Sequence, residues 1–380
     1  MSDTWAVIAG GGTAGHVVPG LAVARALVGR GHPAESIHWV GSRRESERAM
    51  VADAGFEDTP LPGRGIQRRV TYENLGAAWG LARAGAEALS LVRKRRPAVV
   101  LAMGGWASVS CAMAGVALGV PVVVAEQNAI PGAANRLVGR FAKAAAVPFP
   151  GSPLPRAVVT GNPVRADILG VDRSPAGRAA ARAALGLPEG RQVVAVFGGS
   201  LGALRLNNAV LGALEGWADR GDLAVRHVVG ERDWSLVTGG IGDLPKAGVH
   251  YQPVRYDNQR DLSLAAADLV VSRAGGNTVA ELAAVGLPSI LVPLPGAPGD
   301  HQTANARHLA GAGAALVVGD ADLSAARLVR EVDGLLGDPA RLAAMGTAAG
   351  SVARRDAAEA VAALVESHAS TASPPGGPRG

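Results

Sequence analysis

Two glycine-rich turns, each directly after an apolar run, constrain this chain of 380 residues most strongly. The first turn, GGGTAGH at 10–16, follows the run 5–9, and the second, GGSLGA at 198–203, follows the run 193–197. A buried strand, a tight turn and a helix start present backbone N–H groups and a helix dipole to phosphate. Two such units predict two Rossmann-like domains that face one another across a central cleft that holds the substrate.

Apolar runs alternate with helical stretches along both halves of the chain. This alternation predicts an α/β fold with parallel sheets. The aromatic content of 3% fits the aliphatic cores that such sheets bury. The expected strands are residues 6–9, 37–40, 99–102, 122–125, 158–160, 193–197, 224–229, 249–252, 269–272, 289–292 and 315–318.

A break between the two series of strands divides the chain. We place the domain boundary and a hinge at residues 161–165, GNPVR, ahead of the polar stretch 171–189. The Ser-, Pro- and Gly-rich tail is expected to be disordered. The expected parts are an N-terminal domain at 1–162 completed by a C-terminal helix at 351–366, a C-terminal domain at 163–350, and the tail at 367–380.

Charge and cysteine content limit the classes of function. The net charge of +5 permits contact with an anionic surface but does not by itself indicate nucleic acid, so no nucleic-acid partner is expected. Cys111 is the only cysteine, which leaves neither an internal disulfide nor a cysteine metal cluster. The uncharged run 97–125 is long enough to span a bilayer, but its glycines favour a buried βαβ unit. The N-terminus lacks a signal segment, which predicts a cytoplasmic chain.

The first glycine turn matches the dinucleotide fingerprint G-x-G-x-x-G. NAD enzymes place an acidic residue after the second strand, whereas this chain has Arg43 and Arg44 there, which leaves NADP as an alternative. A turn that only packs helix on strand is another alternative. His16 opens the predicted helix, where the dipole disfavours imidazolium. It is therefore either a neutral proton acceptor or a packed, capping side chain.

Residues 272–281 suit either a nucleoside or a plain helix cap. Thr278 and Glu281 have the spacing of a capping box, which needs no ligand. A glycine-rich turn before a helix also suits a nucleoside, with Glu281 bound to the vicinal hydroxyls of a ribose. Farther along, Gln302 and Asn305 lie one helical turn apart and either bind sugar hydroxyls or form a solvated helix start.

Asp320 and Asp322 spell the Asp-x-Asp pattern of metal-dependent glycosyltransferases. Acidic residues are also favoured at helix N-caps, and a helical stretch follows at Leu323. We therefore interpret the pair as a cap and expect no metal site.

Seven features in a fixed order carry a family resemblance. They are GGTAGH at 11–16, EQN at 126–128, GNPVR at 161–165, GGS at 198–200, SRAG at 272–275, TVAE at 278–281, and Gln302. This ordered set resembles the MurG family of glycosyltransferase family 28, and the resemblance covers the chain up to about the final helix. It implies a GT-B fold and transfer of N-acetylglucosamine from UDP-N-acetylglucosamine to undecaprenyl-diphospho-muramoyl-pentapeptide (lipid I). It also implies inversion at the anomeric carbon, with no metal and no cofactor.

The resemblance implies roles for individual residues. The C-terminal domain would bind the donor and the N-terminal domain the lipid acceptor. His16 is the expected general base, with Glu126 as the alternative. The residues expected to bind UDP-N-acetylglucosamine are Thr13, Ala14, Gly15 and Asn128 at the sugar; Arg165 and Ser200 at the diphosphate; Gly276, Asn277, Thr278, Val279, Ala280 and Glu281 at ribose and phosphate; Gln302 at the sugar hydroxyls; and Asp257 at uracil through main-chain atoms.

The sequence departs from the family pattern at several of these positions. Ala14 replaces a usual glycine, Asp257 stands where the family prefers an aliphatic residue, and His301 replaces a common glutamine. Gly276 and Asn277 replace a usual Ala-Leu or Ala-Met pair. These changes concern the uracil contact and details of the loops rather than the donor class.

The implied partners are UDP-N-acetylglucosamine, lipid I and the anionic inner-leaflet surface of the cell membrane, with cell-wall synthesis or division proteins as further candidates. Three arginines around two apolar residues fit a peripheral membrane contact, and a solvated basic face is the alternative. Two other functions stay open: a related GT-B enzyme acting on another lipid, and an NADP- or nucleotide-binding protein. The basic and apolar residues are Arg64, Arg68, Arg69, Ile66 and Val70.

Overall fold

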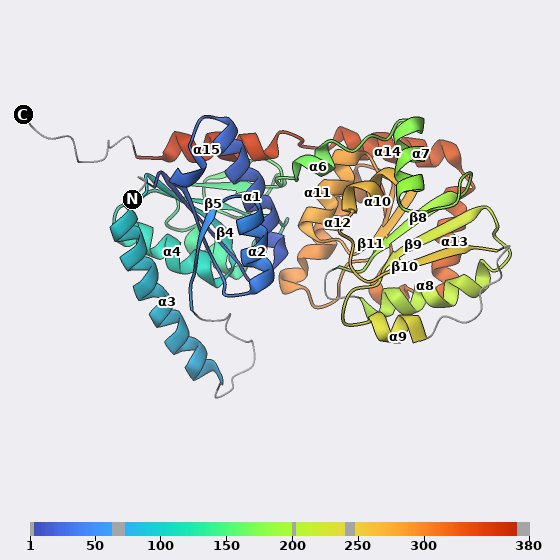
Figure 1. Ribbon diagram of the computed structural model, residues 1–380, viewed down its shortest axis with the longest axis horizontal. Helices are drawn as coiled ribbons and strands as arrows, with labels where there is room; N and C mark the ends of the chain where they lie inside the picture. Colours follow the sequence, from blue (N-terminus) through green and yellow to red (C-terminus); the bar gives the residue numbers. More distant parts are fainter. Residues whose placement is uncertain (1–3, 63–72, 200–202, 240–247, 371–380) are drawn as a thin grey trace, which may run out of the picture. The chain divides into compact units, whose positions relative to one another are not determined.

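The computed structural model describes residues 4–62, 73–199, 203–239 and 248–370. Contacts divide the chain into two compact units, Met1–Arg165 with Arg355–Gly380, and Ala166–Arg354. Each unit is built on one parallel sheet covered by helices (Figure 1). The α/β class with parallel sheets that the alternation of runs predicts is therefore confirmed.

The N-terminal unit contains a seven-stranded sheet in the order β3-β2-β1-β4-β5-β6-β7, in which all pairs are parallel. Ile8 on β1 lies opposite Trp39 on one side and Leu101 on the other. The strand order reverses between β1 and β4, which makes this the switch point of the sheet. The strands are β1 Ala6–Gly10, β2 Ile37–Gly41, β3 Glu57–Pro60, β4 Val99–Gly104, β5 Val122–Ala125, β6 Ala144–Val147 and β7 Ala157–Val159.

Alternate residues of β1 face the two sides of this sheet, as the period of a strand requires. Ala6 and Ile8 belong to a core that includes buried residues of α1 and α15, and Val7 and Ala9 belong to one that includes α3 and α4. The uncharged run 97–125 forms β4, α4 and β5, the predicted buried βαβ unit. In the part of the chain that the structure describes, no helix has the length and apolar character needed to cross a membrane. The helices of this unit are α1 Ala14–Gly29, η1 Ala34–Ser36, α2 Glu45–Asp53, α3 Glu73–Arg95, α4 Gly105–Ala117, α5 Ala133–Val138 and α15 Ala357–His368.

The last helix, α15, returns to the N-terminal unit and packs beside α1 (Figure 1). Glu366 accepts hydrogen bonds from Arg30 at 2.9 and 2.6 Å, and it lies 3.0 Å from His32 Nε2. The prediction of one helix over 351–366 is wrong at its start. Ser351 ends α14 (Pro339–Ser351), and α15 begins only at Ala357 after a non-helical connection.

The C-terminal unit contains a six-stranded parallel sheet in the order β10-β9-β8-β11-β12-β13, which is the Rossmann order, with its switch point between β8 and β11. The strands are β8 Gln192–Phe197, β9 Leu223–Val228, β10 His250–Val254, β11 Leu269–Ser272, β12 Ser289–Leu291 and β13 Ala315–Val317. The other helices of this unit are α6 Ala166–Leu169, α7 Pro175–Ala184, α8 Leu204–Gly216, α9 Trp234–Gly239, α10 Arg260–Ala266, α11 Gly276–Val285, η2 Pro298–Asp300, α12 His301–Gly311, η3 Asp320–Asp322 and α13 Ala325–Leu336.

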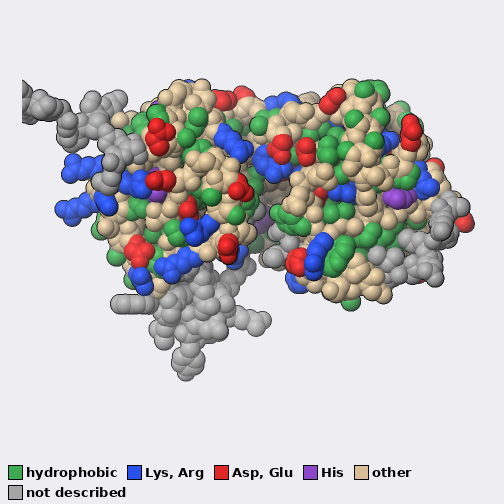
Figure 2. All heavy atoms as spheres, viewed as in Figure 1, with side chains coloured by type: hydrophobic (Ala, Val, Ile, Leu, Met, Phe, Trp, Pro, Cys, Tyr) green, Lys and Arg blue, Asp and Glu red, His purple; other side chains and the backbone are tan. Residues whose placement is uncertain are grey.

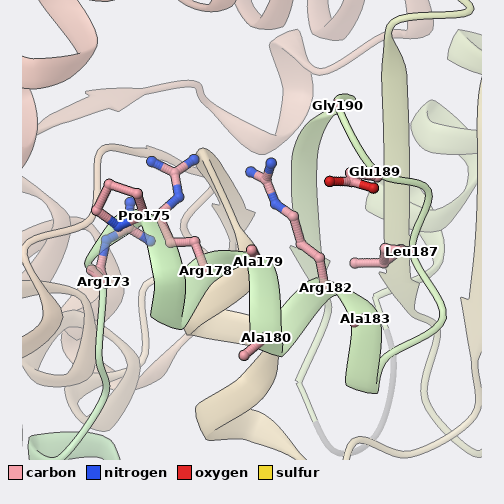
Figure 3. A pocket seen from close by; sticks show the side chains of 10 residues that line it. All are labelled: Arg173, Pro175, Arg178, Ala179, Ala180, Arg182, Ala183, Leu187, Glu189 and Gly190. Atoms are coloured by element: carbon pink, nitrogen blue, oxygen red, sulfur yellow. The ribbon is translucent and has the colours of Figure 1, made fainter.

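The polar stretch 171–189 mostly forms α7, which packs against α10 in this unit. Its arginines line a pocket of about 730 Å³ (Figure 3). Arg178 and Arg182 both pair with Asp268, which directly precedes β11, and Arg173 donates to the Ala267 carbonyl at 2.7 Å. Burial and the two neighbouring arginines lower the pKa of Arg173 to about 10. The arginines therefore fasten α7 to the amino-terminal edge of the sheet.

Candidate functional site

In each unit, a glycine-rich turn follows the strands at the switch point. Gly10 ends β1 and Gly104 ends β4 in the N-terminal unit. In the C-terminal unit, Gly198 follows β8 and Gly275 lies three residues after β11. Open parallel sheets bind ligands at this carboxyl edge, in the crevice at the switch point. The two edges are therefore the candidate sites, and each is described for its own unit.

A buried carboxylate occupies the first glycine turn. Glu47 Oε2 accepts the Gly12 N–H at 3.2 Å and the Ser42 hydroxyl at 2.5 Å. A Cβ on Gly11 would lie 3.2 Å from the same oxygen and 2.9 Å from the Ser42 nitrogen, so this approach needs glycine. Because an N–H of the turn already binds a protein anion, the turn is poorly suited to a dinucleotide phosphate. This arrangement argues against the NADP alternative.

His16 is held by the backbone of the same turn. Its Nδ1 lies 3.1 Å from the carbonyl oxygen of Gly11, and because a carbonyl only accepts, Nδ1 carries the proton. A neutral ring then has its lone pair on Nε2. Burial lowers the pKa of His16, although the Gly11 hydrogen bond and the charges of Glu126 and Glu47 oppose this effect. The site therefore favours a neutral histidine with an acceptor at Nε2.

Gly104 and Gly105 make room for this histidine. Both have left-handed backbone angles, with φ of 113° and 82°. A Cβ on Gly104 would lie 2.9 Å from His16 Nε2, and one on Gly105 would lie 2.2 Å from the Gly11 oxygen. The β4–α4 turn thus packs directly on the first glycine turn. The adjacent glycines Gly104 and Gly105 are a sequence signal from which the contact between the β4–α4 turn and the first glycine turn could have been predicted.

Glu126 is used to hold its own loop. Its Oε1 accepts hydrogen bonds from the Gln127 and Asn128 N–H groups at 3.0 and 2.9 Å and from Asn128 Nδ2 at 3.2 Å. Its Oε2 accepts from the Gly132 N–H at 3.0 Å and from Asn135 Nδ2 at 2.9 Å. Five donors exceed the roughly four lone-pair sites of a carboxylate. This saturation favours His16 over Glu126 as a proton acceptor.

The other candidates of the N-terminal unit lie at or near this edge. Thr13 is the N-cap of α1 but makes no side-chain cap, and Ala14 is the first residue of the helix. Thr13 and Gly15 are exposed, and Asn128 is half-buried in the Glu126 loop. The structure thus places Thr13, Gly15 and His16 together after β1, with Asn128 in the loop after β5, two strands away in the sheet.

The second glycine turn is described only in part. Gly199 has a φ of 95°, a conformation that side chains rarely adopt. Ser200, the expected diphosphate contact, lies outside the described residues.

α11 begins three residues earlier than the capping-box alternative requires. Gly275 is its N-cap, without a side-chain cap, so Thr278 already lies inside the first turn. The cap interpretation of Thr278 and Glu281 is therefore wrong. The uncapped first turn, which includes Gly276 and Asn277, directs backbone N–H groups and the positive end of the dipole to the switch point. Val279 is buried in the core, so its side chain is not available to a ligand.

Glu281, one turn into α11, pairs with Arg260 at the start of α10. Arg260 Nε and Nη2 lie 3.1 and 3.0 Å from Glu281 Oε2. The guanidinium carbon of Arg260 lies 3.7 Å from the ring centroid of Phe197, the last residue of β8. Arg260 was not among the residues that sequence reasoning singled out.

Gln302 and Asn305 together clamp the backbone of Ala274. Gln302 Oε1 accepts the Ala274 N–H at 3.1 Å and the Leu294 N–H at 2.9 Å, while Asn305 Nδ2 donates to the Ala274 carbonyl at 3.0 Å. Both bonds to Gln302 come from N–H donors, so its amide orientation is fixed and Nε2 remains the donor. Asn305 is fully buried, which corrects its assignment to sugar hydroxyls.

The side chain of Asp257 turns inward. Its Oδ1 lies 3.2 Å from Arg226 Nη2, and both side chains are buried. Arg226 also donates to Ser263 at 2.9 Å and to Gln252 at 2.6 Å. The acidic residue at this aliphatic position of the family thus has a buried basic partner. The side chain is engaged in the core, which leaves the main chain for a base contact.

Asp320 joins two segments of the C-terminal unit and caps no long helix. It lies 2.6 Å from Arg273 Nη1 and 3.0 Å from Arg205 Nε. The N-cap of α13 is Ser324, whose hydroxyl accepts the Arg327 N–H at 3.1 Å. The predicted N-cap role is thus wrong. Among the described residues, no three His, Cys, Asp or Glu side chains are grouped as a metal site requires.

The remaining candidates are basic residues. Arg165 is half-buried and is the last residue of the first stretch of the N-terminal unit. Arg64, Arg68 and Arg69 lie outside the described residues. On the face shown in Figure 2, both acidic and basic side chains occur on each unit.

Comparisons with known proteins agree with this architecture. Residues 6–147 match the glycosyltransferase family 28 N-terminal domain, and residues 193–361 match the C-terminal domain of that family. A protein of Nocardioides sp. named UDP-N-acetylglucosamine–N-acetylmuramyl-(pentapeptide) pyrophosphoryl-undecaprenol N-acetylglucosamine transferase is 43% identical, over 94% of this chain and 96% of the relative. A protein of the same name from Desulforudis audaxviator is 36% identical, over 95% and 97%.

Solved structures show the same fold. The crystal structure of Acinetobacter baumannii MurG matches with a TM-score of 0.73 and 26% identity, over 96% of this chain and 99% of that one. A UDP-GlcNAc 2-epimerase from Neisseria meningitidis matches with a TM-score of 0.64 at 12% identity, which shows the fold alone. The GT-B class expected from the sequence is confirmed. On the strength of the two domain matches and the relatives that span nearly its whole length, this chain belongs to glycosyltransferase family 28.

Proposed function

We propose that this enzyme transfers N-acetylglucosamine from UDP-N-acetylglucosamine to the C4 hydroxyl of the muramoyl sugar in undecaprenyl-diphospho-MurNAc-pentapeptide. The names of its relatives support this substrate pair. The observation that carries the proposal is the switch point of the C-terminal unit, where the uncapped start of α11, Glu281 and the Gln302 clamp share one edge of the sheet. That edge offers groups for each part of a nucleotide sugar.

The C-terminal unit is proposed to bind the donor. The first turn of α11, Gly276 to Thr278 with the following main chain to Ala280, would hold the diphosphate through backbone N–H groups and the helix dipole. Glu281 would accept hydrogen bonds from the ribose hydroxyls, and Gln302 Nε2 would donate to a sugar hydroxyl. The main chain at Asp257 would contact uracil, and Ser200 and Arg165 would contact the diphosphate.

The N-terminal unit, with α15, is proposed to bind the acceptor and to supply the base, with Thr13, Ala14, Gly15 and Asn128 near the transferred sugar. His16 Nε2 would take the proton of the C4 hydroxyl as its oxygen bonds to C1 of N-acetylglucosamine. The C1–O bond to the diphosphate breaks at the same time, and UDP leaves with the electron pair. A single displacement of this kind inverts the anomeric carbon, and a base of this sort contributes about 10²–10⁴ in rate.

The enzyme is further proposed to work at the cytoplasmic face of the cell membrane, where its acceptor is anchored. The support lies in the sequence, in the arginines of 64–69 that flank apolar residues. An apolar patch rimmed by cations binds anionic lipid more tightly than zwitterionic lipid, and salt weakens this binding.

The test is a comparison of acceptors with radiolabelled UDP-N-acetylglucosamine. We expect label to pass to a short-chain analogue of the undecaprenyl-diphospho-MurNAc-pentapeptide and not to diacylglycerol. Transfer to diacylglycerol alone would instead identify a related enzyme with another lipid acceptor. If NADP bound tightly and UDP did not bind, both hypotheses, transfer to the muramoyl acceptor and transfer to another lipid, would be wrong.

A further inference from the structure

Arg260 lies at the donor edge of the C-terminal unit, although neither the sequence motifs nor the family resemblance singled it out. It is the first residue of α10, and its side chain reaches Glu281 on α11 and Phe197 at the end of β8. Phe197 directly precedes Gly198 and Gly199 of the second glycine turn. Arg260 thus connects three segments that meet at the switch point.

We propose that Arg260 is a positioning residue for the donor nucleoside. It fixes the carboxylate of Glu281 so that one oxygen is held by the protein and the other receives the vicinal hydroxyls of the ribose. The inference rests on the proposed function, because it deepens the role given there to Glu281.

The pattern of hydrogen bonds supports this division of the carboxylate. Both contacting nitrogens of Arg260, Nε and Nη2, approach the same oxygen, Oε2, at 3.1 and 3.0 Å. Within the described ranges, Oε1 of Glu281 receives no hydrogen bond from the protein. A carboxylate oxygen has two lone pairs, so Oε1 can accept from both hydroxyls of a cis diol. The clamp therefore leaves the acceptor that a ribose needs.

Burial and stacking hold the clamp in place before the ligand arrives. The side chains of Arg260 and Glu281 are only 16% and 13% exposed. The guanidinium lies 3.7 Å over the Phe197 ring, a geometry in which the planar group gains cation–π attraction while its edge donates to Glu281. A lysine can donate to Glu281 but cannot stack and donate in this planar manner. Preorganisation of this kind raises affinity because less side-chain freedom is lost on binding.

The test compares UDP with 2′-deoxyuridine diphosphate, which lacks one hydroxyl of the diol. Calorimetry on the full chain gives the dissociation constant of each nucleotide for the native protein, Arg260→Met and Arg260→Lys. We expect the native protein to prefer UDP. Arg260→Met should weaken UDP binding by about tenfold and weaken 2′-deoxyuridine diphosphate binding less, because the deoxynucleotide keeps only one of the two hydroxyls that donate to Glu281. Arg260→Lys should keep part of the preference for UDP over 2′-deoxyuridine diphosphate.

A control variant distinguishes the loss of the Arg260 contact from a general effect of replacing an arginine. Arg327→Met removes an arginine that pairs with Glu331 within α13, and it should change neither dissociation constant. If Arg260→Met weakened both nucleotides equally, or if Arg260→Lys kept the full preference, the positioning role would be wrong. A native protein that bound UDP without preferring it would overturn the ribose contact of Glu281. A native protein that bound neither nucleotide would overturn the proposed donor site itself.

Discussion

The Nδ1 atom of His16 lies 3.1 Å from the carbonyl oxygen of Gly11, two atoms of one glycine-rich turn. This contact determines the tautomer, because the carbonyl can only accept a proton from the ring. Nε2 is then the basic nitrogen, and a Cβ added to Gly104 would lie 2.9 Å from it. A turn whose sequence resembles a phosphate-binding fingerprint is here the support of a histidine.

Removal of the imidazole tests this role. His16→Ala should lower kcat at saturating substrates by about 10²–10⁴, the usual contribution of a general base. The dissociation constant of UDP should not change, because His16 is proposed to act on the acceptor hydroxyl and not to contact the nucleotide. His368→Ala, at the end of α15, is the matched control and should keep native activity. A near-normal kcat for His16→Ala would show that another group takes the proton.

The pH dependence of the reaction follows from the same site. Burial lowers the pKa of His16 below its ordinary value of 6.5. The neutral, basic form therefore persists to more acidic pH, and kcat/KM should decline only below pH 6.5. A profile of kcat/KM against pH measures this limb. A decline centred above 6.5 would contradict a half-buried, neutral His16.

The space that Gly104 leaves for His16 gives a second prediction. Gly104→Ala would place a methyl group 2.9 Å from Nε2 and force the ring to move, so kcat should fall while UDP affinity stays native. Gly119 also has a positive φ, 72°, but a Cβ there would meet nothing within 4 Å. Gly119→Ala therefore introduces the strain of a positive φ without any steric contact of the added methyl group. Equal losses of kcat in the two variants would show that strain, and not the ring contact, matters.

Glu126 should behave as a structural residue. Glu126→Gln places an NH₂ group against one of the two sets of donors, and we expect a loss of about 1–3 kcal/mol in the free energy of unfolding. Urea unfolding measures this loss. The rate should also fall, because the loop carries Asn128, but the acid limb of kcat/KM should keep its midpoint. Disappearance of that limb in Glu126→Gln would mean that Glu126 is the titrating base.

Gln302 offers a nearly isosteric test of sugar recognition. In Gln302→Glu, an oxygen still accepts from Ala274 and Leu294, but the Nε2 donor becomes an oxygen. The KM for UDP-N-acetylglucosamine should rise about tenfold, whereas the affinity for UDP alone should not change. Equal weakening of both ligands would place Gln302 at the nucleotide rather than at the sugar.

His227 should make the C-terminal unit sensitive to acid. It is fully buried between Tyr251 and Asn207, and burial lowers its pKa to about 3. Below pH 6.5 the unfolded chain therefore binds a proton that the folded chain excludes, so the free energy of unfolding falls as pH falls. This one group contributes a slope of about 1.4 kcal/mol per pH unit between pH 6.5 and the folded-state pKa. His227→Gln should remove that slope in urea unfolding; an unchanged slope in His227→Gln would refute the assignment.

The sequence allowed much of the fold to be predicted, because apolar runs bounded by glycine mark buried parallel strands. Two strands were not predicted. β3 has the polar sequence EDTP at the edge of its sheet, and β6 is nearly all alanine, so neither shows a strand-like pattern. The prediction of one final helix over 351–366 missed the connection at 352–356, because these five residues carry no glycine or proline.

The secondary-structure positions of the candidate residues were predicted better than their contacts. Sequence spacing placed Gly11 directly after a strand, and His16 and Glu281 in the helices that follow β1 and β11, where the structure has them. The sequence could not show that the carboxylate of Glu126 accepts hydrogen bonds from its own loop, or that the carboxylate of Glu47 binds the first glycine turn. Both facts depend on contacts between residues that are separated in the sequence. Arg260 was missed for the same reason: Glu281 and Phe197 lie 21 and 63 positions away from it in the sequence.

The most direct measurement of the central claim is the anomeric configuration of the product formed in excess EDTA. Native enzyme, labelled UDP-N-acetylglucosamine and the undecaprenyl-diphospho-MurNAc-pentapeptide analogue are incubated, and the glycosidic proton coupling of the product is read by NMR. The account predicts an undiminished rate and a β-linkage to C4 of the muramoyl sugar. An α-linkage, or a rate abolished by EDTA, would contradict a metal-independent single displacement.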